Sequence, residues 1–209
     1  MLIININQKK YNDKIVLQDI NINIDSPGIY GIIGKNGEGK TTLFKCLVGL
    51  EKFQGNCTIG ENKVLLQNVA WVPTEPTIYS ELTANEFYDF YIHLLDLKKT
   101  KSHLLFEVPE NQLIKEFSTG MKKKTYLNAV FQKEFLIYIL DEPFNGLDLE
   151  SNYLLMTYIR ELSKTKIVFI SSHILEILYK DCKSIFLIQN TKIKEFKKDE
   201  YFRIEKELF

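Results

Sequence analysis

The chain has 209 residues, of which 45% are hydrophobic and 26% charged, as is ordinary for a soluble globular protein. Its 27 basic and 27 acidic residues cancel, so net charge gives no sign of a nucleic-acid partner. Three widely spaced cysteines without a C-x-x-C pair favour reduced thiols in a cytosolic compartment. The N-terminus does not resemble a signal peptide, and the longest apolar run, 135–140, is too short to span a bilayer.

The first 33 residues are predicted to form antiparallel strands that lead into a short buried strand. Apolar residues alternate with period two over 2–6, 15–17 and 20–24, with turn residues at 12–13 and 26–28. Tyr11 falls in a turn between two of these strands. Taken alone, it is best interpreted as an ordinary half-exposed tyrosine.

Residues 34–41, Gly-Lys-Asn-Gly-Glu-Gly-Lys-Thr, fit the phosphate-binding P-loop pattern G-x-x-x-x-G-K-[ST]. The motif lies between the predicted strand 28–33 and a predicted helix over 41–50, where its successive N–H groups can form an anion nest. Lys40 supplies a charge to the β- and γ-phosphates, and the Thr41 hydroxyl is placed to bind Mg²⁺. The alternative is a glycine-rich turn with an unrelated lysine, which the flanking strand and helix disfavour. The candidate nucleotide-binding residues here are Gly34, Lys35, Asn36, Gly37, Glu38, Gly39, Lys40, Thr41 and Thr42.

Residues 51–72 predict further short strands, with turns at 55–56 and 60–62, followed by a loop with two prolines. Thr83 and Glu86 form a capping box that begins a helix. Its apolar stripe contains Phe87, Phe90, Tyr91, Leu94 and Leu95, and we predict a core face for Phe87, Phe90 and Leu94. Tyr88 and Tyr91 add more aromatic side chains than one small core needs, so the alternative interpretation of this helix is a surface that binds a partner.

Residues 96–117 predict a short, irregular helical patch broken at Pro109. His93 and His103 have no acidic or cysteine partner at metal-ligand spacing, so we interpret both as surface or packing residues.

The second half alternates between helices and strands. Helices are predicted from 118 to 131, over 150–162 and over 174–179, and strands over 135–140, 166–170, 184–188 and 192–196. The charged tail 197–209 is predicted to be a short helix or strand on a solvated face. The fold class is therefore α/β: a P-loop NTPase core with a mainly parallel sheet flanked by helices, an N-terminal antiparallel β-subdomain and a small helical subdomain.

Two carboxylates follow the apolar strand 135–140. Because ligands bind at the carboxyl ends of parallel strands, Asp141 should lie beside the P-loop, where it can hold Mg²⁺ opposite Thr41. Glu142 is placed to polarise the water that attacks the γ-phosphate. The alternative is an acidic turn after a strand, and the nearby P-loop disfavours it.

With these motifs in order, the whole chain resembles the ATP-binding subunit of an ABC (ATP-binding cassette) transporter. Tyr11 matches the aromatic residue that stacks on adenine, 34–42 match Walker A and 136–142 match Walker B with its glutamate. The signature sequence, the D-loop and the switch histidine are matched by 117–122, 145–148 and 172–173.

The resemblance implies a mechanism in which two cassettes pack head to tail around ATP. Ser118 and Gly120 of one cassette would close over the γ-phosphate held by the other, with Asp148 crossing the interface. His173 would bind the γ-phosphate and orient the water for Glu142, with Lys40 as a further catalytic residue. It implies ATP and Mg²⁺ as cofactors, a separate transmembrane permease, no nucleic acid, and a cytoplasmic place on the inner face of the cell membrane.

Three features depart from the family pattern. Thr74, followed by Glu75, stands where a metal-contacting glutamine is expected, so either Thr74 or Glu75 would reach the metal through water. Thr119 and Met121 replace the usual glycine and glutamine of the signature, and the short version resembles exporter cassettes. The whole chain is predicted to be one ATPase domain, with the core and β-subdomain at about 1–73 and 125–209. The helical subdomain, at about 74–124, is short.

Two alternatives remain open at this stage. One is a soluble ABC ATPase that acts on nucleic acid or the ribosome, which the single cassette and zero net charge disfavour. The other is a poorly hydrolysing cassette that binds ATP for assembly, which Thr74 mildly favours. The transported substrate, the permease and the identity of the second cassette are not encoded in these motifs.

Overall fold

The computed structural model describes residues 1–97 and 104–208. An antiparallel sheet at the N-terminus has the order β2-β1-β4-β5. Its alternate apolar residues share one buried face, as at the cross-strand pair Ile4 and Ile22. The strands are β1 (Leu2–Tyr11), β2 (Lys14–Ile24), β4 (Gln54–Ile59) and β5 (Asn62–Lys63).

The central sheet has the order β10-β9-β3-β8-β7-β6, and all its pairings are parallel except that of β9 with β10. Every residue of β3, β7 and β8 is buried, because elements cover both faces of the sheet. The strands are β3 (Gly28–Ile33), β6 (Val69–Val72), β7 (Ile137–Asp141), β8 (Ile167–Ser171), β9 (Ser184–Gln189) and β10 (Lys192–Lys197).

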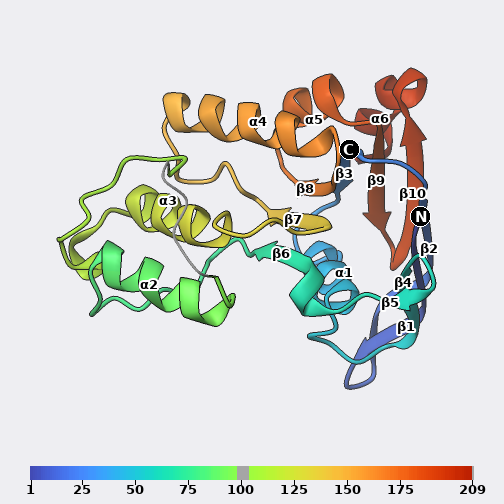
Figure 1. Cartoon of the computed structure of the whole chain (residues 1–209). Helices are drawn as coiled ribbons and strands as arrows, with labels where there is room; N and C mark the ends of the chain where they lie inside the picture. Colours follow the sequence, from blue (N-terminus) through green and yellow to red (C-terminus); the bar gives the residue numbers. More distant parts are fainter. Residues whose placement is uncertain (98–103, 209) are drawn as a thin grey trace.

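Helices divide between the two faces of this sheet (Figure 1). Helix α1 packs with the N-terminal sheet on one face, against residues such as Phe169, while α4 and α5 cover the other face, against residues such as Val168. Helices α2 and α3 lie together at one end of the molecule (Figure 1). The helices are α1 (Lys40–Leu47), α2 (Ala84–Leu94), α3 (Thr119–Val130), α4 (Leu149–Ser163), α5 (Leu175–Asp181) and α6 (Ile204–Leu208), with 3₁₀ turns η1 (Leu66–Asn68), η2 (Ile114–Glu116) and η3 (Lys198–Arg203).

The predicted fold class is confirmed, including the antiparallel N-terminal sheet and the mainly parallel sheet. The turn predicted at 55–56 is wrong, because these residues lie inside β4. Gly55 has φ 131°, and a Cβ there would lie 2.1 Å from the Asn5 carbonyl oxygen. The glycine therefore marks an irregularity in the pairing with β1, where the register shifts between Ile6 and Gln8, rather than a turn.

Helix α2 begins with the predicted capping box of Thr83 and Glu86, but its core face differs from the prediction. Phe87 and Tyr88 are buried, whereas Phe90 is 38% and Leu94 61% exposed. Tyr88 accepts a hydrogen bond from Asn128 of α3 at 3.1 Å, so α3 selects the face that is buried. The prediction of a core role for Phe90 and Leu94 is therefore wrong.

The predicted helical patch over 96–117 is mostly irregular where it is described. Residues 104–117 contain one 3₁₀ turn, Ile114–Glu116. The Asn128 side chain accepts a hydrogen bond from the Phe106 main-chain N–H at 3.0 Å and donates one to the Phe106 carbonyl oxygen at 2.8 Å. His93 is exposed, as predicted, and its Nδ1 lies 2.7 Å from the Asp89 carbonyl oxygen, whereas His103 lies outside the described residues. The division into subdomains at 74 and 124 stays a prediction.

The C-terminal tail corrects a third prediction. Tyr201, Ile204 and Leu208 are buried, and the Tyr201 hydroxyl donates to the Cys182 carbonyl oxygen at 3.0 Å. The spaced apolar residues thus pack against the sheet layer instead of forming a solvated face. No helix in the described part of the chain has both the length and the apolar composition needed to cross a bilayer.

Candidate active site

A cleft of about 370 Å³ opens at the edge of the central sheet where β3, β7 and β8 end. It brings together the P-loop, the two carboxylates and the histidine that the sequence singled out, although they come from distant parts of the chain. This edge collects ligand-binding residues because the carboxyl ends of parallel strands meet there. The lining residues are Asn36, Gly37, Gly39, Lys40, Thr41, Thr42, Thr74, Asp141, Glu142, Asn145 and His173.

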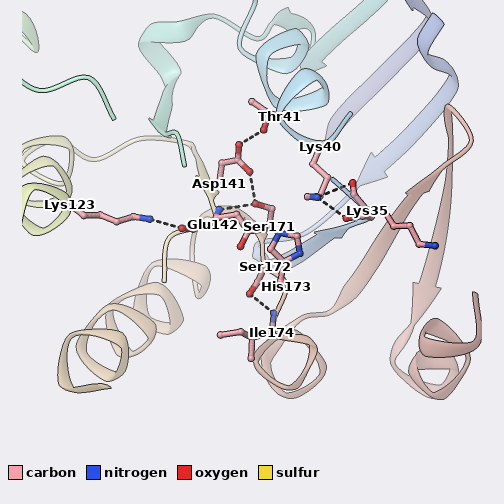
Figure 2. Close-up of polar contacts among 11 residues, drawn as sticks. Lys35, Lys40, Thr41, Lys123, Asp141, Glu142, Ser171, Ser172, His173 and Ile174 are labelled. Carbon is pink, nitrogen blue, oxygen red and sulfur yellow. Dashed lines mark hydrogen bonds and ion pairs between the residues drawn. The ribbon is translucent and has the colours of Figure 1, made fainter. Parts of the chain in front are cut away.

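The P-loop curls around the amine of Lys40. Lys40 Nζ donates to the carbonyl oxygens of Gly34 at 2.7 Å and Lys35 at 3.3 Å (Figure 2). Burial lowers the pKa of Lys40, while Glu142 and Asp141 act in the opposite direction. The turn needs glycine at Gly34, where φ is 152° and a Cβ would lie 2.5 Å from the Ile188 carbonyl oxygen.

Helix α1 presents free backbone donors to this cleft. Its N-cap is Gly39, with φ 108° and no side-chain capping bond. The N–H groups of the first turn therefore lack a side-chain acceptor, and they add to the positive end of the helix dipole. This combination binds an anion such as a phosphate group.

A chain of hydrogen bonds joins α1 to β7 and β8 (Figure 2). Thr41 Oγ1 donates to Asp141 Oδ2 at 2.6 Å, and Ser171 Oγ donates to Asp141 Oδ1 at 2.5 Å. Ser171 in turn accepts from the Glu142 main-chain N–H at 2.8 Å. Sequence reasoning missed Ser171, whose signal was a polar residue at the end of an otherwise apolar strand.

Glu142 has an unusual main chain and an unpaired side-chain oxygen. Its φ is 51°, a left-handed conformation that costs free energy in a residue other than glycine and concentrates at functional sites. His173 Nε2 lies 3.0 Å from Glu142 Oε1, yet this buried oxygen has no hydrogen-bond partner within residues 1–97 and 104–208, so the contact lacks hydrogen-bond alignment. Burial raises the pKa of the Glu142 carboxyl, while His173 and Lys40 act in the opposite direction.

Of the predicted signature and D-loop residues, Ser118, Gly120 and Asp148 lie outside the cleft, whereas Asn145 lines it. Ser118 caps α3 by accepting from the Met121 N–H at 3.2 Å, and Asp148 caps α4 by accepting from the Ser151 N–H at 2.8 Å. Lys124 Nζ lies 2.8 Å from Asp148 Oδ2, and this bond holds the pKa of Asp148 well below its usual range. Neither Ser118, Gly120 nor Asp148 lines the cleft of its own chain.

Lys123 is a second residue that sequence reasoning missed. It is 4% exposed, and its Nζ donates to the carbonyl oxygens of Glu142 at 2.6 Å and Asn145 at 3.2 Å. Burial lowers its pKa to about 8, while Glu142 and Asp141 act in the opposite direction.

Tyr11 ends β1 and is 41% exposed. Lys9 Nζ lies 4.3 Å from the ring centroid and donates to Glu51 at 2.8 Å. Burial raises the pKa of Tyr11, and the Thr42 side chain next to its hydroxyl lowers it. This contact places Tyr11 beside the P-loop, although it does not line the cleft. Thr74 does line it.

The sequence model of the ABC transporter family matches residues 17–145. This chain belongs to the ABC transporter family. It is 31% identical over 201 residues to the SkfA peptide export ATP-binding protein SkfE of Bacillus subtilis, covering 88% of this chain and 84% of that protein. It is 34% identical to the bacitracin transport ATP-binding protein BcrA of Bacillus licheniformis over 80% of this chain and 60% of that protein.

Solved structures agree with this assignment. The structure of an ATP-binding subunit of an ABC transporter superposes with a TM-score of 0.88 at 27% identity, covering 99% of this chain and 93% of that one. A dimeric ATP-binding cassette bound to ADP and Pi has the same fold, with a TM-score of 0.81 at 18% identity over 94% of this chain and 98% of that one. This ABC protein is therefore an ATP-binding subunit with ATPase activity that energises a transporter.

Proposed function

We propose that this ABC ATPase works as a head-to-tail dimer of cassettes that sandwiches ATP and drives an exporter through a separate permease. The observation that carries the proposal is the separation of two half-sites in one chain. Lys40, Asp141, Glu142 and His173 share a cleft, whereas Ser118 caps a helix that does not line it. A second copy that contributes its own Ser118 would complete the phosphate site.

The residues of the cleft fit a hydrated Mg²⁺ ion. Thr41 and Asp141 bring a hydroxyl and a carboxylate oxygen within 2.6 Å of each other beside the P-loop, and Mg²⁺ prefers such oxygen ligands. We propose that these two residues hold the ion, with Thr74 reaching it through water from the cleft wall. When bound, Mg²⁺ would neutralise charge on the β- and γ-phosphate oxygens.

The protein groups then have separate roles in hydrolysis. Lys40 and the N–H groups of residues 34–42 bind the phosphates, and Tyr11 stacks on adenine. Glu142 accepts a proton from the attacking water through Oε1, the buried oxygen that has no hydrogen-bond partner among the described residues. His173, 3.0 Å from that oxygen and 53% exposed, donates to the γ-phosphate and orients the water. Asp148 contacts the partner cassette.

Export as the direction of transport rests on the relatives. One is named as a peptide export ATP-binding protein and another as a bacitracin transport ATP-binding protein. We place the cassette on the cytoplasmic side of the cell membrane, held by the permease. The helical subdomain at about 74–124 would contact that permease, and no nucleic acid takes part.

The sandwich is tested with Glu142→Gln, which keeps the shape of the side chain but removes the base. With ATP and Mg²⁺, this variant should elute from size-exclusion chromatography as a dimer that retains ATP. The matched control is the double variant Lys40→Ala/Glu142→Gln, which should stay monomeric because it cannot grip the phosphates. If Glu142→Gln remains monomeric with ATP, the sandwich is wrong.

A further inference from the structure

Helix α3 carries three consecutive lysines at 122–124, and Lys123 is the one that is buried. Its side chain crosses from α3 to the main chain that follows β7 (Figure 2). Burying an ammonium group is costly unless acceptors compensate it. Here the acceptors are two main-chain carbonyl oxygens, those of Glu142 at 2.6 Å and Asn145 at 3.2 Å. A side chain that only filled space at this position would not need a charge.

The bond to Glu142 acts on a strained residue. Glu142 has φ 51°, and such a conformation persists only where the surroundings determine it. Side chains hold both of its main-chain polar groups: Ser171 accepts from the N–H at 2.8 Å, and Lys123 donates to the carbonyl oxygen. Among the described residues Glu142 Oε1 has no hydrogen-bond partner, although His173 Nε2 lies 3.0 Å away, so this main-chain grip helps to set the direction of the carboxylate.

The same helix carries the signature at its N-terminus. Ser118 is the N-cap of α3, five residues before Lys123. The first turns of α3 also touch the D-loop directly, since a Cβ on Gly120 would lie 2.6 Å from the Gly146 carbonyl oxygen. Lys124 adds its 2.8 Å ion pair with Asp148. The start of α3 therefore contacts residues 142–148 through hydrogen bonds, an ion pair and a close main-chain approach.

We propose that Lys123 is a positioning residue that fixes the direction of the Glu142 carboxylate and links it to the signature helix of the same chain. The inference rests on the proposed function, since it takes Glu142 as the base and a dimer as the active form. In that dimer the signature of one copy closes over the nucleotide of the other. Lys123 would therefore make the glutamate of one site respond to closure of the second site.

The first test replaces Lys123 with methionine, which keeps most of the length and removes the donor. The kcat for ATP should fall about 10- to 100-fold, as expected for a displaced catalytic group, while the KM and the Kd for ATP stay within about threefold. The control is Lys180→Met, an exposed lysine of α5, which should leave kcat unchanged. A folded Lys123→Met protein with kcat within about twofold of wild type overturns the proposal.

The second test uses mixed dimers purified through two different tags, and it cancels any general loss of stability. In the cis dimer, one chain carries Lys123→Met and Glu142→Gln and its partner is wild type. In the trans dimer, the two substitutions are on different chains. If Lys123 serves its own glutamate, the cis dimer keeps the activity of a dimer with Glu142→Gln alone, and the trans dimer loses about tenfold or more.

The reverse pattern would mean that Lys123 supports only the signature, and equal losses would mean that it only stabilises the fold. Either result overturns the proposal. If Glu142→Gln alone forms no dimer with ATP, the proposed sandwich fails instead, and the kcat of Lys123→Met still tests the hold on Glu142.

Discussion

The cleft around the P-loop and the surface around α2 use their side chains in opposite ways. At the cleft, Thr41 and Ser171 both donate hydrogen bonds to Asp141, although the three residues come from three different elements. Around α2, large apolar side chains remain exposed, including Phe90 at 38% and Leu94 at 61%. Leu94 also lines an apolar groove of about 400 Å³, together with Leu66, Gln67, Val69, Ala70, Trp71, Tyr91, Leu95, Tyr126, Val130, Lys133 and Phe135.

The cleft is built from side chains of one chain, whereas the α2 surface has exposed apolar side chains that a partner could cover. The cleft residues that we propose to hold Mg²⁺ and to bind the phosphates at the P-loop all come from one chain, so nucleotide binding should survive in an isolated cassette. The α2 surface keeps apolar area in contact with water, as is common at protein–protein contact sites. The comparison predicts that substitutions in the two regions affect different measurements.

The largest expected effect is on stability, inside the α2 region. Phe87 is fully buried, so Phe87→Ala should lower the free energy of unfolding by about 3–5 kcal/mol. Leu94→Ala, on the exposed side of the same helix, should change it by less than about 0.5 kcal/mol. Urea unfolding measures both. Equal effects would show that α2 does not bury the face described here.

Next in size is the loss of nucleotide binding on removing Lys40. Lys40→Ala should lower the affinity for ATP about 100-fold or more, which corresponds to about 2.8 kcal/mol, because the phosphates lose their positioned charge. Isothermal titration calorimetry measures the affinity, with Lys180→Ala as the control. Unchanged binding in Lys40→Ala would place the phosphate site elsewhere.

A smaller effect is expected at Tyr11. Tyr11→Ala should weaken ATP binding by about 1–2 kcal/mol if the ring stacks on adenine, whereas Tyr11→Phe should stay close to wild type. Inorganic tripolyphosphate, which has no base, provides the internal control because its affinity should be the same in all three proteins. If Tyr11→Ala binds ATP as wild type does, Tyr11 is an ordinary surface tyrosine.

The same comparison shows why part of the structure could be predicted from sequence. The cleft residues belong to short sequence motifs. Lys40 begins a helix, Asp141 ends a strand and His173 lies two residues after the end of another strand. Once the strands are parallel, their order brings these ends to one edge. Short-range patterns were therefore sufficient for the fold class and for most residues of the cleft.

Residues whose role depends on distant partners were not predictable in this way. Lys123 lies in a run of lysines typical of a solvated face, and only the packing of α3 against residues 142–145 turns it inward. Ser171 acts through Asp141, 30 positions earlier in the chain. On α2, two overlapping apolar stripes fit the helical period, and α3 decides that the stripe with Tyr88 is buried instead of the stripe with Leu94.

The most direct test of the shared site mixes two chains that are each defective in one half. Both carry Glu142→Gln; one adds Lys40→Ala to disable the P-loop, and the other adds Ser118→Arg to block the signature. Analytical ultracentrifugation with ATP and Mg²⁺ should find monomers for each chain alone and a dimer in the mixture, because one intact P-loop then meets one intact signature. Dimers of either chain alone, or no dimer in the mixture, would contradict a nucleotide site shared between two copies.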